Sequence, residues 1–515
     1  MVSSDTTVPA LGTRDGALGA DATEVVTTDQ ATGRELARYP VAGAPEAIAA
    51  VRVARATAGA WSDLGFDGRA LRLNAWRREI ATGGEELAAL IHDENGKPTE
   101  DARAEVLGVL AHLQFVIANA ARVLGRRDVP SPPATSNQRA WIEYLPYGVV
   151  AVIGPWNFPL ATPGAICVHA LAAGNAVVLK PSQITPGVGE WLARSWRRAV
   201  PEFPGVFQNL IGFGATGQAL IEAGVDKVAF TGSVRSGRLV AAQCANTLTP
   251  TLLELGGKDP VIVAEDADLD EAAVHIVWGA LQNAGQGCIS LEVAYVVDSV
   301  YDAFVEKITA LAASVRAGSD DDAQMGPVPL APQIPIIRRH IEDALARGAS
   351  VPVGGPETAD GDRYVQPTIL VGVPADALAA TEETFGPTLA VVKVADTDEA
   401  IARTNASPYG LGSSVFSRHH GETIARRLQV GMTSINDALM VSQFAGLPFG
   451  GRGDSGHGRK HGDEGLREFA YPHAITDKTG PAPFPTSTFD RPAGAMAAAL
   501  AATRDRIMAE VDPRP

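Results

Sequence analysis

Residues 149–153 read Val149-Val150-Ala151-Val152-Ile153, a run of apolar side chains that predicts a strand buried on both faces. An apolar helix is expected after it, at 161–173. The same succession of strand and helix recurs three times, with strands expected at 175–180, 206–211 and 227–230 and helices expected at 186–199, up to Gly224 and at 234–245. Strands that alternate with helices in this way form a parallel sheet covered on both faces. The sequence therefore predicts an α/β fold whose ligands bind at the carboxyl ends of the strands.

A second α/β unit is expected after Gly257. Its predicted strands are 260–263 and 294–297, and its predicted helices are 300–315 and 335–347. Ahead of the first unit, residues 43–125 carry helical periodicity, clearest at 45–61 and 68–91. The remaining expected elements are a strand or hairpin at 139–152, a strand at 469–475 and a short helix at 495–511.

Size and charge exclude several classes of function. A chain of 515 residues exceeds one ordinary core, so two or three domains are expected. A net charge of −16 argues against a nucleic-acid backbone or an anionic membrane as a partner. Its apolar runs fall short of the roughly 20 residues of a membrane span. Residues 1–24 lack the basic and apolar regions of a secretory signal.

The three cysteines suggest different roles. Cys167 and Cys244 lie in apolar stretches and are expected to be small core residues. Cys288 lies instead in Gly285-Gln286-Gly287-Cys288-Ile289-Ser290, where glycines let a ligand approach the backbone. No disulfide framework is indicated, which favours a reducing cytoplasm.

Glu254 is the natural partner of this thiol in a reaction. It lies in Leu253-Glu254-Leu255-Gly256-Gly257-Lys258, a stretch that predicts a glycine-bracketed turn. Acyl chemistry on sulfur needs a thiolate that attacks a carbonyl and a base that releases the product. Cys288 and Glu254 are therefore the candidate nucleophile and base.

A phosphate cradle is expected where residues 230–237 follow one strand and open a helix. Thr231 and Ser233 can cap that helix or bind a phosphate, and Gly232 lets the backbone come close. An ordinary serine-capped helix explains this turn equally well. Lys180 ends another strand of the same sheet, and the two features together favour a dinucleotide.

Seven motifs, in order and spacing, resemble the aldehyde dehydrogenase superfamily across residues 25–478. They are Gly154-Pro155-Trp156-Asn157-Phe158-Pro159, Lys180-Pro181-Ser182, Phe230-Thr231-Gly232-Ser233, Glu254-Leu255-Gly256-Gly257-Lys258, Gly285-Gln286-Gly287-Cys288, Glu382-Glu383-Thr384-Phe385-Gly386-Pro387 and Pro448-Phe449-Gly450-Gly451.

The resemblance implies roles for these residues. Cys288 attacks the aldehyde, Asn157 and the Cys288 N–H hold the oxyanion, and Glu254 activates the water that hydrolyses the thioester. The site is expected to lower the pKa of the thiol with backbone dipoles and the charge of the bound nicotinamide. The residues implied to bind NAD or NADP are Trp156, Lys180, Ser182, Gln183, Thr231, Gly232, Ser233, Leu255, Glu383 and Phe385.

The resemblance also implies a domain plan. The plan is α/β throughout, with a parallel-sheet, Rossmann-like cofactor domain at 23–127 and 147–256 and an α/β catalytic domain at 257–455. The remaining parts are a leader at 1–22, disordered or extended, a small β oligomerisation element at 128–146 and 466–478, and a C-terminal extension at 479–515. A homodimer or homotetramer is expected.

Three departures from the family pattern affect the expectations. Gln183 stands where many NAD-preferring members carry glutamate, so NADP is acceptable or slightly favoured. No arginine follows Cys288 at 289–294, so one structural ion pair is expected to be missing. No arginine or lysine lies between Asn436 and Leu447, which disfavours a carboxylated aldehyde and favours an apolar or aromatic one.

The implied substrate tunnel is the least constrained part of the site. Its candidate lining residues are Phe158, Thr162, Gln282, Ile289 and Phe444, with Ala165, Gly287, Leu439, Met440 and Val441. His457 and His461 have a spacing that can suit a metal on a helix, but no third ligand is evident and Gly458 weakens a helix there, so no metal is expected.

Three alternative functions remain open from the residues. One is a dehydrogenase that passes the acyl group to coenzyme A, against which Glu254 argues. Another is a cofactor-independent thiol esterase, against which the cofactor motifs argue. The last is a non-catalytic scaffold, for which replacing Cys288 changes nothing beyond stability.

Overall fold

The computed structural model describes residues 22–132, 135–320, 322–359, 363–481 and 488–509. The predicted leader at 1–22 lies almost wholly outside this range. The chain divides into two compact units. Unit 1 comprises residues 1–123 and 146–470, and unit 2 comprises residues 124–145 and 471–515.

The first sheet of unit 1 has six strands in the order β17-β9-β8-β5-β6-β7. All pairs are parallel except β17 with β9. The strands are β5 (Val149–Ile153), β6 (Ala176–Lys180), β7 (Phe207–Asn209), β8 (Lys227–Thr231), β9 (Thr251–Glu254) and β17 (Gly456–His457). Between them run α5 (Ala161–Ala173), α6 (Pro186–Ala199), α7 (Gly214–Glu222) and α8 (Val234–Ala245).

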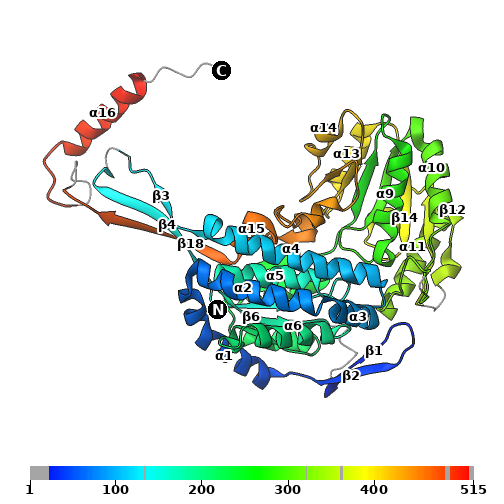
Figure 1. The fold of residues 1–515 in the computed structure, drawn as a ribbon. Helices are drawn as coiled ribbons and strands as arrows, with labels where there is room; N and C mark the ends of the chain where they lie inside the picture. Colours follow the sequence, from blue (N-terminus) through cyan, green and yellow to red (C-terminus); the bar gives the residue numbers. More distant parts are fainter. Residues whose placement is uncertain (1–21, 133–134, 321, 360–362, 482–487, 510–515) are drawn as a thin grey trace, which may run out of the picture. The chain divides into compact units, whose positions relative to one another are not determined.

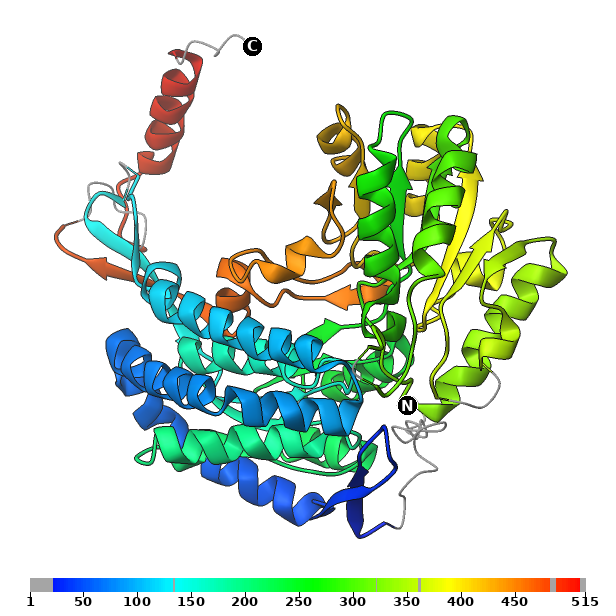
Figure 2. The ribbon, with the colours of Figure 1, turned by 45° about the vertical axis from the view of Figure 1, so that its right-hand side comes forward.

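The second sheet of unit 1 has seven strands in the order β12-β13-β14-β11-β10-β15-β16. Its strands are β10 (Asp259–Val263), β11 (Leu291–Val297), β12 (Ser350–Val353), β13 (Thr368–Val371), β14 (Thr388–Val394), β15 (Ser414–Phe416) and β16 (Ser434–Ile435). The main helices around it are α9 (Leu269–Leu281), α10 (Asp298–Ala312), α11 (Ile334–Ala346), α12 (Leu378–Thr381), α13 (Thr397–Ala406) and α14 (Gly421–Ala425). Figure 2 shows this green-to-yellow body of strands and helices. The α/β fold class is confirmed.

The amino-terminal part of unit 1 is mainly helical. A two-stranded antiparallel sheet of β1 (Glu24–Thr28) and β2 (Glu35–Pro40) precedes α1 (Ala44–Asp63), α2 (Gly65–Thr82), α3 (Gly84–Asn95) and α4 (Thr99–Leu124). The helical run expected at 68–91 is therefore divided, because adjacent Gly83 and Gly84 separate α2 from α3. In Figure 1, α2, α4, α5 and α6 lie together over the first sheet.

Helix α4 packs as part of the core. Among the described helices it alone is long and apolar enough to span a membrane by length and composition. However, its Val109, Leu113 and Val116 are fully buried. Core helices of globular proteins show the same composition.

Unit 2 contains a three-stranded sheet in the order β18-β4-β3, with β3 (Arg127–Val129), β4 (Gln138–Pro146) and β18 (Ala470–Lys478). It also contains α16 (Ala495–Ala509), which has no buried residue. The two segments expected to build an oligomerisation element thus pair within one chain, while their role in assembly stays a prediction.

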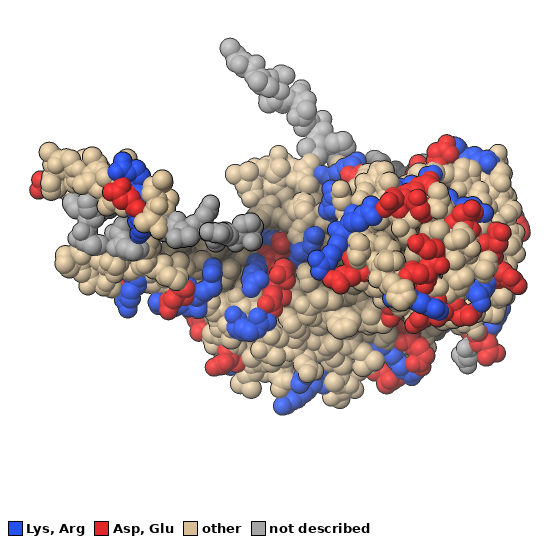
Figure 3. Space-filling model, turned by 90° about the horizontal axis from the view of Figure 1, so that it is seen from above, with Lys and Arg blue, Asp and Glu red and all other residues tan. Residues whose placement is uncertain are grey.

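Charges are dispersed over the surface of the molecule. Lysine and arginine alternate with aspartate and glutamate over the face drawn in Figure 3. Ion pairs on the surface join both close neighbours, such as Arg403 with Glu399, and residues far apart in the sequence, such as Arg55 with Asp226. This distribution shows no continuous basic stripe on that face, in keeping with the net charge of −16.

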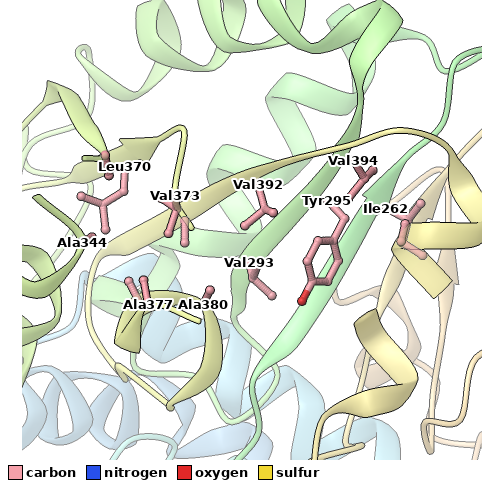
Figure 4. Close-up of a cluster of buried hydrophobic side chains, with 14 of the residues drawn as sticks. Ile262, Val293, Tyr295, Ala344, Leu370, Val373, Ala377, Ala380, Val392 and Val394 are labelled. Carbon is pink, nitrogen blue, oxygen red and sulfur yellow. The ribbon is translucent and has the colours of Figure 1, made fainter. Parts of the chain in front are cut away.

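One face of the seven-stranded sheet carries a large apolar cluster. Figure 4 shows Ile262, Val293, Val392 and Leu370 from four strands gathered beside alanines of α11 and α12. Small residues in the helices let the branched side chains of the strands fill the space between the layers. This core fixes β11 and β14, and the loops that precede both strands reach the candidate active site.

We expect Leu370→Ala to lower the free energy of unfolding by about 2–5 kcal/mol, because Leu370 is fully buried and the change leaves a cavity. Leu71→Ala is the matched control, since Leu71 is 66% exposed. The measurement is the urea midpoint of each variant. Equal midpoints for the two variants would contradict the assignment of Leu370 to the core.

Candidate active site

Two cavities of unit 1 meet at Cys288. One, of about 410 Å³, lies along the carboxyl ends of β5, β6, β8 and β9. The other, of about 180 Å³, lies beside α4, α5 and the loop that carries Cys288. Cys288 and Thr162 line both cavities. A ligand in one cavity can therefore reach the same sulfur as a ligand in the other.

The larger cavity contains every residue predicted to bind the dinucleotide. These are Trp156, Lys180, Ser182, Gln183, Thr231, Gly232, Ser233, Leu255, Glu383 and Phe385, and they lie there with Asn157, Glu254 and Cys288. Most of them follow or end strands of the six-stranded sheet, as the rule for parallel sheets requires. We call this cavity the cofactor cleft.

The cleft offers groups that fit a nicotinamide dinucleotide. The 12-residue helix α8 begins in the cleft, capped by Ser233, whose Oγ accepts a hydrogen bond from Ser236 N at 3.3 Å. A helix N-terminus attracts a phosphate. Thr231 Oγ1, beside this turn, is buried without a hydrogen-bond partner. Burial lowers the pKa of Lys180 to about 8.

Glu383 presents a carboxylate at the other end of the cleft. It accepts a hydrogen bond from Gly257 N at 3.0 Å. Burial, and then the neighbouring carboxylate of Glu292, raises its pKa to about 8. Hydroxyl groups of a ribose could donate to its remaining lone pairs.

A buried ion pair holds the loop that carries Phe385. Lys258 Nζ donates to Glu292 Oε2 at 2.6 Å, and Glu292 accepts the backbone N–H groups of Thr384 and Phe385, each at 2.8 Å. Phe385 has a φ of 49° and packs edge-on against Trp156. An ion pair was expected to be missing here, because residues 289–294 contain no arginine. The same stretch contains Glu292, whose buried pair with Lys258 the sequence did not reveal.

Cys288 lies in a loop that glycine makes possible. Gly285 has a φ of +68°, and a Cβ there would lie 2.0 Å from the carbonyl oxygen of Gly386. Gly287 N donates to Ser290 Oγ at 3.1 Å, which tightens the turn before β11. The thiol is half-buried and faces both cavities.

The protein alone raises the pKa of the Cys288 thiol to about 12. Burial is the main cause, and the carboxylates of Glu254, Asp259 and Glu383 act in the same direction. Lys460 lowers it in part. Backbone dipoles therefore do not by themselves offset the burial of the thiol. The lowering expected from the positive charge of a bound nicotinamide stays a prediction.

Asn157 is buried and lines the cofactor cleft together with Cys288. Its Nδ2 donates to the carbonyl oxygen of Gln286 at 2.8 Å, in the loop that leads to Cys288. An amide nitrogen carries two donors, so one remains for a ligand.

The sequence predicts a turn at Glu254. This prediction is wrong, because Glu254 is the last residue of strand β9. Both carboxylate oxygens are buried and make no hydrogen bond. Lys460 Nζ lies 3.4 Å from Oε2. Burial raises the pKa of Glu254, and the ammonium of Lys460 partly opposes that rise. A carboxylate with free lone pairs near the thiol can accept a proton from water.

The smaller cavity contains Phe158, Thr162, Gln282 and Ile289, as predicted. Of the further tunnel candidates it includes Leu439 but not Ala165, Gly287, Met440 or Val441. Phe444 was predicted to line it but is 55% exposed and lies outside the lining, because the turn at Met440–Gln443 directs the chain outward. We call this cavity the thiol pocket.

Several lining residues of the thiol pocket were missed. Helix α4 supplies Asp101, Ala104, Glu105, Gly108 and His112, and other segments supply Trp278, Phe449, Lys460 and His461. The α4 residues recur at helical spacing, so the sequence does show that they share a face. Which helix covers the thiol depends on tertiary packing, which that spacing does not reveal.

His457 and His461 do not form a pair on one helix. His457 lies on β17, and its Nε2 contacts Thr251 Oγ1 at 2.8 Å. His461 precedes α15 (Gly462–Glu468) with a φ of 65° and packs against His112. Within the described residues, no group of three or more histidine, cysteine, aspartate or glutamate side chains is placed to hold a metal ion.

The loop that bears Asn157 is held by a second buried ion pair. Lys97 Nζ donates to Glu105 Oε1 at 2.6 Å and to the carbonyl oxygen of Asn157 at 2.8 Å. Glu105 Oε2 accepts the N–H groups of Leu160 and Ala161, which open α5. The pair thus ties α4 to both ends of this loop.

Lys97→Met is expected to destabilise the fold by about 3–5 kcal/mol, because it leaves the buried carboxylate of Glu105 without its counter-charge. It should also lower turnover by freeing the Asn157 loop. The measurements are the urea midpoint and kcat. Arg103→Met removes an exposed partner of Glu85 and should leave both nearly unchanged; equal losses in the two variants would contradict the role given to Lys97.

Known proteins resemble this chain in sequence and in structure over nearly its whole length. A family model described as "Aldehyde dehydrogenase family" matches residues 18–475. The chain is 38% identical over 455 residues to a 4,4'-diapolycopene aldehyde oxidase of Methylomonas sp, covering 87% of this chain and 85% of that protein. It is 35% identical to an NADP+-dependent succinate-semialdehyde dehydrogenase of Escherichia coli, covering 86% and 92%. The crystal structure of an NAD-dependent aldehyde dehydrogenase from Sinorhizobium meliloti superposes with a TM-score of 0.85 at 32% identity, covering 91% and 94%.

Proposed function

The chain belongs to the aldehyde dehydrogenase family, and we propose that it oxidises an uncharged, apolar or aromatic aldehyde to the carboxylic acid. It is an NAD(P)-dependent oxidoreductase that acts on aldehydes. The observation that carries the proposal is the meeting of the cofactor cleft and the thiol pocket at one sulfur.

In the first step Cys288 acts as the nucleophile. The thiolate sulfur forms a bond to the aldehyde carbon, and the carbonyl oxygen gains the negative charge. The free donor of Asn157 Nδ2 and the backbone N–H of Cys288 are the candidates to hold this oxyanion, and a single such donor is typically worth about 10²–10³ in rate.

The cofactor cleft would orient a bound nicotinamide. That group would accept the hydride that the former aldehyde carbon of the adduct on Cys288 loses as the adduct becomes a thioester. Glu383 would hold the nicotinamide ribose and Lys180 the adenosine ribose, while Phe385 would pack beside the ring. Trp156 and Ser233 at the start of α8 would bind the pyrophosphate.

In the last step Glu254 accepts a proton from water. The water oxygen bonds to the thioester carbon, the carbon–sulfur bond breaks, and the thiolate of Cys288 leaves with its electron pair. The acid is then released. A base in this place supports hydrolysis over transfer to coenzyme A, since transfer to a thiol acceptor gains nothing from a water-activating carboxylate.

The lining of the thiol pocket supports an uncharged substrate. Phe158, Trp278, Ile289, Leu439 and Phe449 make most of it apolar. Its charged groups do not suit a carboxylated aldehyde: Asp101 would repel a carboxylate, and the ammonium of Lys460 is already paired with Glu254. The imidazoles of His112 and His461 stay neutral, because burial lowers the pKa of both.

A panel of aldehydes tests the substrate class. We expect kcat/KM for benzaldehyde and medium-chain alkanals to exceed that for succinic semialdehyde by at least about tenfold, because one unpaired charge in a mainly apolar pocket costs more than the roughly 1.4 kcal/mol of a tenfold ratio. The measurement is nicotinamide reduction at saturating cofactor. A preference for succinic semialdehyde would overturn the substrate class but leave the reaction intact, whereas acyl-coenzyme A as the product would overturn hydrolysis.

We infer that the cleft accepts NADP at least as well as NAD. Gln183 lines the cleft with a neutral amide, which does not repel a 2′-phosphate, and Arg235 lines the same cleft. NADP-dependent and NAD-dependent proteins both occur among the relatives.

Gln183→Glu is expected to raise kcat/KM for NAD relative to NADP by at least about tenfold, because a carboxylate beside a 2′-phosphate repels it. Gln183→Asn is the control. It keeps a neutral amide, so the ratio of kcat/KM for NAD to that for NADP should not rise in the same way. An unchanged ratio in the glutamate variant would show that Gln183 does not face the 2′ position.

We propose that the chain works in the cytoplasm as a homodimer or homotetramer. Its three cysteines are free, which suits a reducing compartment. The sheet of unit 2 has β18 and β3 at its edges, and edge strands can pair with a second copy. We propose that the cofactor and catalytic domains divide between residues 256 and 257, in the segment that joins β9 of the six-stranded sheet to β10 of the seven-stranded sheet.

A further inference from the structure

Lys460 is fixed in place beside the proposed base. Its backbone N–H and carbonyl both bond to Phe449, at 2.9 and 2.7 Å. Its Nζ lies 4.1 Å from the centroid of the Phe449 ring and 3.4 Å from Glu254 Oε2. The side chains of Lys460 and Glu254 are only 3% and 2% exposed, so water screens this pair little.

The other charged groups near Glu254 are engaged elsewhere or lie farther away. On the neighbouring strands, Lys227 bonds Glu468, and His457 contacts Thr251. Arg459 acts on Glu254 only at longer range, since its guanidinium donates to the carbonyl oxygens of Gly451 and Gly458. Within the described residues, Lys460 is the one cation in an ion pair with Glu254.

Resting on the proposed function, we propose that Lys460 is a positioning residue for hydrolysis of the thioester. Its ammonium holds Glu254 as a carboxylate, directed at the space beside Cys288. Without it, the two buried and unbonded oxygens of Glu254 would take up a proton and lose the capacity to accept one from water.

The direction of the effect follows from the charges. Burial raises the pKa of Glu254, and Lys460 lowers it. A general base works in its deprotonated form, so the hydrolysis rate rises with pH through this pKa. An opposite charge at this distance lowers a carboxyl pKa by about 1–3 units. Removing it should move the acid limb of hydrolysis to higher pH by a similar amount.

The experiment separates acyl formation from hydrolysis in the full-length enzyme with NADP and an aldehyde it oxidises. The pre-steady-state burst of NADPH reports formation of the thioester, and the steady-state rate reports its hydrolysis. For Lys460→Met we expect the burst to keep its amplitude but to form more slowly, because Lys460 also lowers the pKa of the Cys288 thiol. The steady-state rate near neutral pH should fall at least about tenfold, and the midpoint of its acid limb should move up by about one pH unit or more. Lys460→Arg keeps the positive charge and should show the acid limb of the wild-type enzyme. Arg467→Met removes an exposed charge from the same segment and should also leave the acid limb where it is.

A second readout keeps the two proposals distinguishable. Glu254→Gln should lose steady-state turnover and the acid limb while it keeps the burst; retention of both would overturn the assignment of Glu254 itself. If Glu254→Gln behaves as expected but Lys460→Met keeps the wild-type limb, only the role of Lys460 fails. The double variant should be no slower than Glu254→Gln alone, and a further independent loss would overturn the coupling. If Lys460→Met does not fold, the acid limb of the steady-state rate is measured for Lys460→Gln instead, and the same shift to higher pH is expected.

Discussion

A charge removed from water must be paired, and this constraint shapes the whole reaction centre. Three lysine–carboxylate pairs, each at most 4% exposed, lie around the junction of the two sheets: Lys97 with Glu105, Lys258 with Glu292, and Lys460 with Glu254. A buried pair adds little stability by itself, but removal of one partner leaves a costly charge. Each pair therefore restrains the segment to which it is bonded.

The three pairs serve different parts of the site. The first holds the loop of Asn157 through its carbonyl oxygen and the start of α5. The second holds the backbone of Thr384 and Phe385, next to Glu383 in the cofactor cleft. The third reaches Glu254 itself. The proposed oxyanion donor Asn157, the proposed cofactor ligand Glu383 and the proposed base Glu254 are thereby held by pairs from separate segments, as precise chemistry requires.

Much of this arrangement follows from local sequence. Helices α5, α6 and α8 begin and end at the predicted residues, because each lies between a buried strand and a cap or breaker such as Gly174 or Ser233. The residues of the cofactor cleft were found because they follow strands of one parallel sheet. Strand β9 was missed, since four residues ending in a glutamate resemble a turn. Lys460 was missed because only the fold brings it to Glu254, and Phe444 was placed wrongly because its direction depends on a turn that has no strong signal.

The charges around Cys288 link the choice of substrate to the chemistry of release. The ammonium of Lys460 is the one lysine or arginine charge among the described residues that line the thiol pocket. A substrate carboxylate that bound there would have to share this ammonium with Glu254. The base would then lose the charge that opposes its protonation, and hydrolysis would slow with the substrate that bound best. A pocket whose lysine is paired with Glu254 is thus suited to the uncharged aldehyde that we propose, and the same ion pair opposes the protonation of Glu254 that burial favours.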